Sequence, residues 1–96
     1  MKMLMIVYNE ALDNEVMEIL ENCVMKNYTK VSQVFGRGAS SGTHLGNDIW
    51  PGLNNILYVV CEEAQAKEML SGVRILKSKV GHEGIKAFVL PVEEVS

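Results

Sequence analysis

Residues 56–60 read Ile-Leu-Tyr-Val-Val, and residues 3–7 read Met-Leu-Met-Ile-Val, so both runs are apolar or aromatic at every position. Runs of this length are too short for a helix and are typical of strands in the middle of a sheet, buried on both faces. Two other β-branched or aromatic segments, 28–36 and 85–92, are interrupted by polar residues or by Pro91, which a sheet tolerates at its edges. The sequence therefore predicts four strands, with the two continuous runs in the centre.

Two segments between these strands carry apolar residues at the i, i+3, i+4 spacing of an amphipathic helix. The first is expected to be capped by Asp13, to include Val24 in its apolar face and to end at residues 26–27; the second covers about 63–76. The resulting βαββαβ order predicts an α+β, ferredoxin-like sandwich with an antiparallel sheet and both helices on one face. Because the other face of the apolar centre stays uncovered, we expect a homo-oligomer.

Length and composition limit the possible classes. A chain of 96 residues is expected to form a single domain, 1–96, and its net charge of −3 argues against nucleic-acid binding. No apolar run is long enough to be embedded in a membrane, and no signal-peptide cleavage pattern follows Met1. Cys23 and Cys61 lie in apolar positions without metal-ligand spacing, which predicts reduced thiols and a cytoplasmic protein.

A polar, glycine-bearing segment, 37–54, separates the second and third strands and is far longer than a reversal of the chain requires. Loops of this length are usually functional or disordered. The segment begins with Gly36-Arg37-Gly38, where the backbone can approach a ligand beside a permanent cation. We interpret it as a binding loop.

The segment 74–86 has a local charge excess of 4 − 1 = +3, from Arg74, Lys77, Lys79 and Lys86 against Glu83. One interpretation is that these cations only complement the end of a helix dipole. The other is an anion site, because the run leads into Gly81-His82-Glu83-Gly84, whose backbone N–H groups can turn toward a phosphate. The sequence leaves both interpretations open.

Catalysis is not expected, because neither cysteine lies beside a histidine and Ser40, Ser41 and His44 share one short loop segment. Metal binding is a second hypothesis. The donor types are present in His44, Asp48, His82 and Glu83, although their spacing matches no known ligand pattern.

Several stretches resemble the PII signal-transduction proteins and their PII-like relatives. Residues 12–20 are similar to the start of the family's first helix, and 29–38, ending in Phe-Gly-Arg-Gly, are similar to the second strand running into the T-loop. Residues 80–86 resemble the phosphate-binding B-loop, and 88–95, with Leu-Pro-Val-Glu-Glu-Val, resemble the last core strand. The resemblance covers nearly the whole chain.

The resemblance implies a homotrimer that binds a small anionic effector, an adenine nucleotide such as AMP, ADP or ATP, in clefts between subunits. Its T-loop, here 37–54, would regulate a partner protein such as a transporter or enzyme. The ligand-binding residues implied are Thr29, Gly36, Arg37, Gly38, Gly81, His82, Glu83, Gly84 and Lys86.

The chain also departs from the family pattern. Segment 37–54 contains no tyrosine for uridylylation and carries an unfamiliar Trp50-Pro51-Gly52, and the family's arginine-bearing tail would lie beyond Ser96. Binding of ATP and 2-oxoglutarate is therefore left open. The alternative from the same fold is a CutA-type trimer that binds divalent cations.

Overall fold

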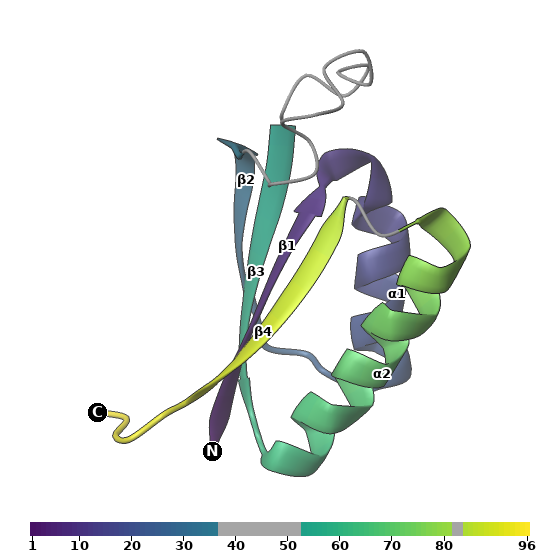
Figure 1. Ribbon diagram of the computed structural model, residues 1–96. Helices are drawn as coiled ribbons and strands as arrows, with labels where there is room; N and C mark the ends of the chain where they lie inside the picture. Colours follow the sequence, from purple (N-terminus) through teal and green to yellow (C-terminus); the bar gives the residue numbers. More distant parts are fainter. Residues whose placement is uncertain (37–52, 82–83) are drawn as a thin grey trace.

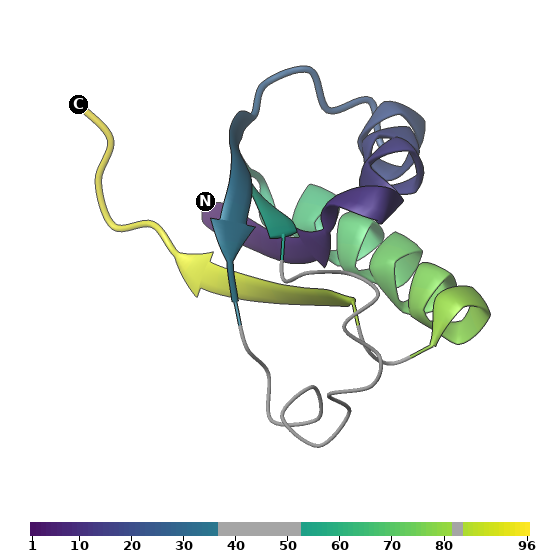
Figure 2. The same ribbon diagram turned by 90° about the horizontal axis from the view of Figure 1, so that it is seen from above.

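The computed structural model describes residues 1–36, 53–81 and 84–96. In chain order, its elements are β1 (Lys2–Asn9), the 3-10 turn η1 (Glu10–Leu12), α1 (Asp13–Asn22), β2 (Thr29–Phe35), β3 (Leu53–Cys61), α2 (Glu63–Val80) and β4 (Ile85–Pro91). The strands form one antiparallel sheet in the order β2-β3-β1-β4. Both helices cover the same face of this sheet (Figures 1 and 2). The ferredoxin-like α+β fold is thus confirmed, with the two continuous apolar runs as its central strands.

The core lies between the sheet and the two helices. Side chains alternate along a strand, so every second residue of β1 and β3 points toward the helices and is buried. Leu4, Ile6, Leu57 and Val59 are fully buried there and contact the apolar faces of α1 and α2. In the described part of the chain, no helix is long and apolar enough to cross a membrane.

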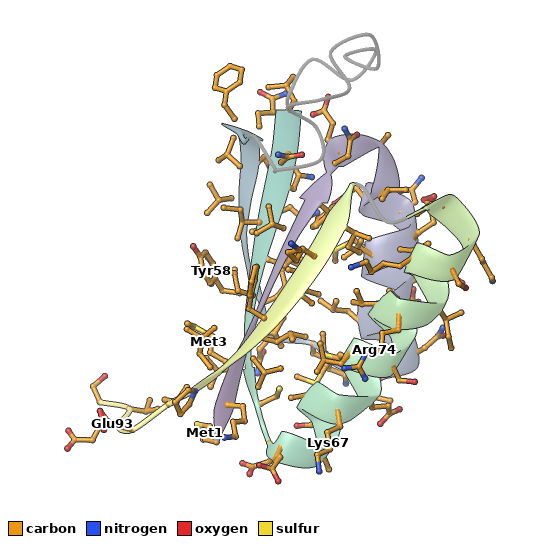
Figure 3. All side chains as sticks on the ribbon, viewed as in Figure 1. Met1, Met3, Tyr58, Lys67, Arg74 and Glu93 are labelled. Carbon is orange, nitrogen blue, oxygen red and sulfur yellow. The ribbon has the colours of Figure 1, made fainter. Side chains whose placement is uncertain are left out.

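The opposite face of the sheet is apolar but uncovered in a single copy of the chain. Cross-strand pairing places Tyr58, Met5 and Phe88 in one row across this face, and Figure 3 shows Tyr58 and Met3 on the side away from the helices. Val60 is 46% exposed and Phe88 44% exposed. Burial of the central strands on both faces, as the sequence predicts, would therefore require a second layer from outside the chain.

Helix α1 ends earlier than the sequence predicts, at Asn22. Val24 has a positive φ of 56°. The N–H of Met25 donates to the carbonyl of Leu20, and the N–H of Val24 donates to the carbonyl of Glu21. This is the Schellman pattern that terminates helices, with a valine at the position that glycine usually takes. Val24 is consequently exposed, and its assignment to the apolar face of the helix was wrong.

Helix α2 and strand β3 are both longer than predicted. Helix α2 starts with a capping box between Glu62 and Gln65 and continues to Val80, where Gly81 ends it with a φ of 99°. Strand β3 begins at Leu53, which pairs with Phe35 of β2. The last two residues of the predicted loop 37–54 are therefore part of the sheet.

Candidate functional site

The chain segments that the sequence predicts to be functional lie at one end of the sheet. β1 and β2 end there, and β3 and β4 begin there. Asn9 pairs with Asn54, and the N–H of Asn9 donates to the carbonyl of Gly84 at 2.7 Å. Gly36 lies at the same end of the sheet, where a Cβ atom would stand 2.7 Å from the side-chain nitrogen of Asn54. The residues that flank segment 37–52 therefore lie at the same end of the sheet as Gly84, with β1 between them.

The glycines that flank residues 82–83 have backbone conformations that few other residues adopt. The φ angles are 99° at Gly81 and 97° at Gly84. Glycine adopts such positive φ angles readily because it has no Cβ atom. The N–H of Gly81 donates to the carbonyl of Lys77 at 2.9 Å and so completes the end of α2. Lys86 follows Gly84 by two residues and pairs with Val7 across the sheet. The phosphate-binding turn stays a prediction, because residues 82 and 83 lie outside the described residues.

Thr29 lies apart from these residues. It is the first residue of β2 and pairs with Tyr58, whereas Gly36 follows the other end of that strand. β2 and β4 are opposite edges of the sheet, separated by β3 and β1, so Thr29 and Lys86 lie on strands about 14 Å apart at ordinary strand spacing. Among the described residues, one copy of the chain therefore keeps Thr29 apart from Gly36 along β2 and from Lys86 across the sheet.

A polar network that the sequence did not predict stabilises the same end of the sheet. Asp13 is the first residue of α1 and does not cap it, since Leu12 occupies the cap position without a side-chain hydrogen bond. Its carboxylate instead accepts hydrogen bonds from the hydroxyl of Tyr8 at 2.6 Å and from the side-chain amide of Asn55 at 3.3 Å. The ammonium of Lys30 lies 2.9 Å from Oδ1 and 3.1 Å from Oδ2. Asp13 therefore joins β1, β2, β3 and α1.

The network shifts the acid–base properties of its members. Partial burial alone would raise the pKa of Asp13, but the hydrogen bonds from Tyr8 and Lys30 and the charge of Lys30 outweigh it and hold that pKa below its ordinary value. Burial, together with the hydrogen bond to the Asp13 carboxylate, raises the pKa of Tyr8 above its usual range. At neutral pH the carboxylate is therefore charged and the phenol is neutral.

A bulge in β2 connects this network to the base of the long segment. The pairing register shifts between Val31 and Val34, and Gln33 has a φ of 55°. The N–H of Gln33 donates to the side-chain oxygen of Asn55 at 3.2 Å. An open hollow of about 450 Å³ lies here, lined by Glu10, Ala11, Asp13, Ser32, Gln33 and Asn55. The network thus holds the bulged backbone of β2 at Gln33, two residues before the strand ends.

Several predicted site residues lie outside the described residues: Arg37, Gly38, His44, Asp48, His82 and Glu83. The metal hypothesis depends on four of these and stays a prediction. Within residues 1–36, 53–81 and 84–96, no group of three or more histidine, cysteine, aspartate or glutamate side chains could hold a metal ion.

No pattern in the sequence indicated the Asp13 network, because Lys30 and Asn55 are 17 and 42 residues away from Asp13 along the chain. A second polar feature was indicated in part by the local charge excess. Arg74 and Lys77 of that excess line a hollow between α2 and β4.

Comparison with known proteins agrees with this geometry. The model of the family "Nitrogen regulatory protein P-II" matches residues 1–96, and the chain belongs to this family of signalling proteins. The match gives no support to the CutA-type alternative. No match was found among curated protein sequences.

Solved structures of PII-like proteins share the fold. CPII from Thiomonas intermedia K12, bound to ADP, AMP and acetate, is 19% identical, with a TM-score of 0.76 over 99% of this chain and 88% of that chain. The same protein with ADP, AMP and bicarbonate is 17% identical, with a TM-score of 0.72 over 99% and 90%. A putative PII-like signalling protein from Thermus thermophilus is 22% identical, with a TM-score of 0.66 over 92% and 81%.

Proposed function

We propose that the protein is a non-enzymatic regulator that binds an adenine nucleotide in clefts between the subunits of a homotrimer. Segment 37–52 would transmit the bound state to a partner protein. The observation that carries the proposal is the position of Gly84 and Lys86 at the start of β4, at the end of the sheet where β2 leads to Gly36, with positive φ angles at the two glycines that flank residues 82–83. CPII, which shares the fold, has been solved with ADP and AMP bound.

The position of Thr29 supports a site between copies. Thr29 and Lys86 lie on opposite edge strands, so a ligand that touches both requires the β2 edge of one copy next to the β4 edge of another. The uncovered apolar face supports the same arrangement, because its row of Tyr58, Met5 and Phe88 would be buried when copies associate. The family supplies the number three.

Calorimetric titration with AMP, ADP, ATP and cyclic AMP tests the nucleotide. Charge-assisted hydrogen bonds contribute roughly 1.5–3 kcal/mol each, so Arg37→Ala and Lys86→Ala should each weaken binding by about tenfold or more. Lys67→Ala is the matched control, because it removes one cation from α2 away from the glycine turn. Light scattering should give the same mass for all three variants. Absence of binding by every nucleotide at millimolar concentration would refute the proposal.

A further inference from the structure

Asn55 is the only amide or charged residue that is buried among the described residues, with 6% of its surface exposed. Both polar groups of its side chain are used. The nitrogen donates to Oδ1 of Asp13 at 3.3 Å, and the oxygen accepts the N–H of Gln33 at 3.2 Å. A buried polar side chain of this kind can select one arrangement of the chain over another, because only that arrangement satisfies its hydrogen bonds.

β2 has one residue more than β3 at the point where it meets this side chain. Val31 pairs with Ile56, whereas the next paired residue, Val34, pairs with Asn54. Two residues of β2, 32–33, therefore stand opposite a single residue of β3, which is the count of a β-bulge.

Without the bulge, β2 would continue in the register of its first half. Gln33 would then pair with Asn54, and Val34 with Leu53. A slip of one residue moves every later side chain of a strand to the other face of the sheet. It would also move Gly36, a predicted ligand-binding residue, by about 3.4 Å along β3. β2 is an edge strand whose neighbour among the described strands is β3 alone (Figure 1), so no second strand sets its register.

The bulged register needs a specific stabilising contact. Gln33 has a φ of 55°, a left-handed conformation that is costly for a residue other than glycine and persists where the surroundings enforce it. In the regular register the oxygen of Asn55 would lose the N–H of Gln33, and an unsatisfied buried acceptor is costly too. Asp13 holds the strand before the bulge as well, because it pairs with the Lys30 ammonium. The two side chains thus favour the bulged register over the regular one.

We propose that Asn55 is a positioning residue, which selects the bulged register of β2 and thereby places Gly36 for ligand binding. It acts through the backbone of Gln33 and not by touching the ligand. The inference rests on the proposed nucleotide site and names the side chain that sets the geometry of the strand leading to it.

Nuclear magnetic resonance of the ¹⁵N,¹³C-labelled full chain measures the register first, without ligand. In the wild type, cross-strand nuclear Overhauser effects should join Val34 to Asn54. In Asn55→Leu they should instead join Val34 to Leu53 and Gln33 to Asn54, because leucine offers the bulge no acceptor. Asn55→Ser, whose hydroxyl lies closer to its own backbone, should behave in the same way and replaces Asn55→Leu if that variant does not fold.

Deletion of Gln33 provides the rescue that a general structural role would not predict. The deletion removes the extra residue, so that Val34 meets Asn54 in a regular ladder without help from residue 55. Deletion of Gln33 combined with Asn55→Leu should therefore restore this contact.

Calorimetry with ADP gives the functional readout. Asn55→Leu should weaken binding by about tenfold or more, as expected for the loss of one hydrogen bond to a charged group. The double variant with the Gln33 deletion should regain the wild-type affinity. The matched control is Tyr8→Phe, which removes a hydrogen bond to Asp13 but keeps the bond between Gln33 and Asn55. Its register and its ADP affinity should equal those of the wild type.

Four results would overturn the inference. The first is a contact between Val34 and Asn54 that persists in Asn55→Leu and Asn55→Ser, and the second is a double variant in which this contact is not restored. The third is a shifted register with unchanged ADP affinity. The fourth is an equal shift in Tyr8→Phe, which would show a general loss of stability. If the wild type binds no nucleotide, the proposed function is refuted, and the cross-strand contacts alone decide whether Asn55 sets the register.

Discussion

Replacing Asp13 by alanine should destabilise the fold far more than removal of any exposed acid on the same helix. The substitution removes the acceptor for the Tyr8 hydroxyl, the Lys30 ammonium and the Asn55 amide. Tyr8 is only 1% exposed, so its hydroxyl would lose its acceptor in a place that water does not reach readily. An orphaned buried donor costs about 1–3 kcal/mol.

The loss of the ion pair adds to this cost. Breaking a fully buried pair costs about 3–5 kcal/mol. The side chains of Lys30 and Asp13 retain 23% and 34% of their exposure, so water screens part of the interaction and the Lys30 ammonium stays partly hydrated. We therefore expect Asp13→Ala to lower the free energy of unfolding by about 2–4 kcal/mol in total.

Urea denaturation at one fixed protein concentration measures the effect, because association would otherwise change the apparent stability. Glu15→Ala is the matched control: Glu15 is also an acid in the first turn of α1 and gains the same dipole interaction, but it is exposed. Its effect should stay within about 0.5 kcal/mol. Equal losses in the two variants would show that Asp13 acts only through the helix dipole and would refute the network.

The pH dependence, the sheet face and the glycine turn can be tested in the same way. First, the pKa of Asp13 lies below its ordinary value of 3.8, so its contribution to the free energy of unfolding is complete above that pH and is lost as the pH falls further through the folded-state pKa. The difference in stability between wild type and Asp13→Asn should therefore narrow below about pH 4. A difference that stays constant down to about pH 2 would contradict this. Second, Tyr58→Lys places a charge on the uncovered sheet face and should reduce the mass in light scattering from about 32 kDa, three times 10.7 kDa, toward 10.7 kDa. The control is Ile75→Lys, at a position 56% exposed on α2, which should leave the mass at that of the wild type. Third, Gly84→Ala forces a side chain onto a φ of 97° and should cost about 1–2 kcal/mol in urea denaturation, whereas Ser71→Ala on the exposed surface of α2 should cost less than about 0.5 kcal/mol.

The sequence predicted the order of the strands because each strand's composition reflects its local surroundings. The runs at 3–7 and 56–60 are continuous in apolar residues, and Pro91 marks an edge strand. The exact element ends were harder to predict. Val24 in a left-handed conformation ends α1 against the preference of a β-branched residue. Residues 53–54 are part of β3 because β2 pairs with both of them and Asn9 of β1 pairs with Asn54.

The candidate site was predicted in part, for a similar reason. Glycines in a turn are visible in the sequence, and Gly81 and Gly84 indeed have positive φ angles. The Asp13 network depends on contacts between α1 and three strands, which no local pattern encodes. Asp13 precedes a helical pattern and therefore looked like a cap, while its carboxylate is committed to Tyr8, Lys30 and Asn55.

Native mass spectrometry of the full chain with and without ADP tests the central claim most directly, because one spectrum reports both assembly and ligand. The account predicts a trimer of about 32 kDa, three times 10.7 kDa, that binds up to three ADP molecules, and no ADP on any monomer. A monomer that binds ADP by itself would contradict a site shared between copies. A trimer that stays free of ADP, AMP and ATP at millimolar concentration would contradict nucleotide binding.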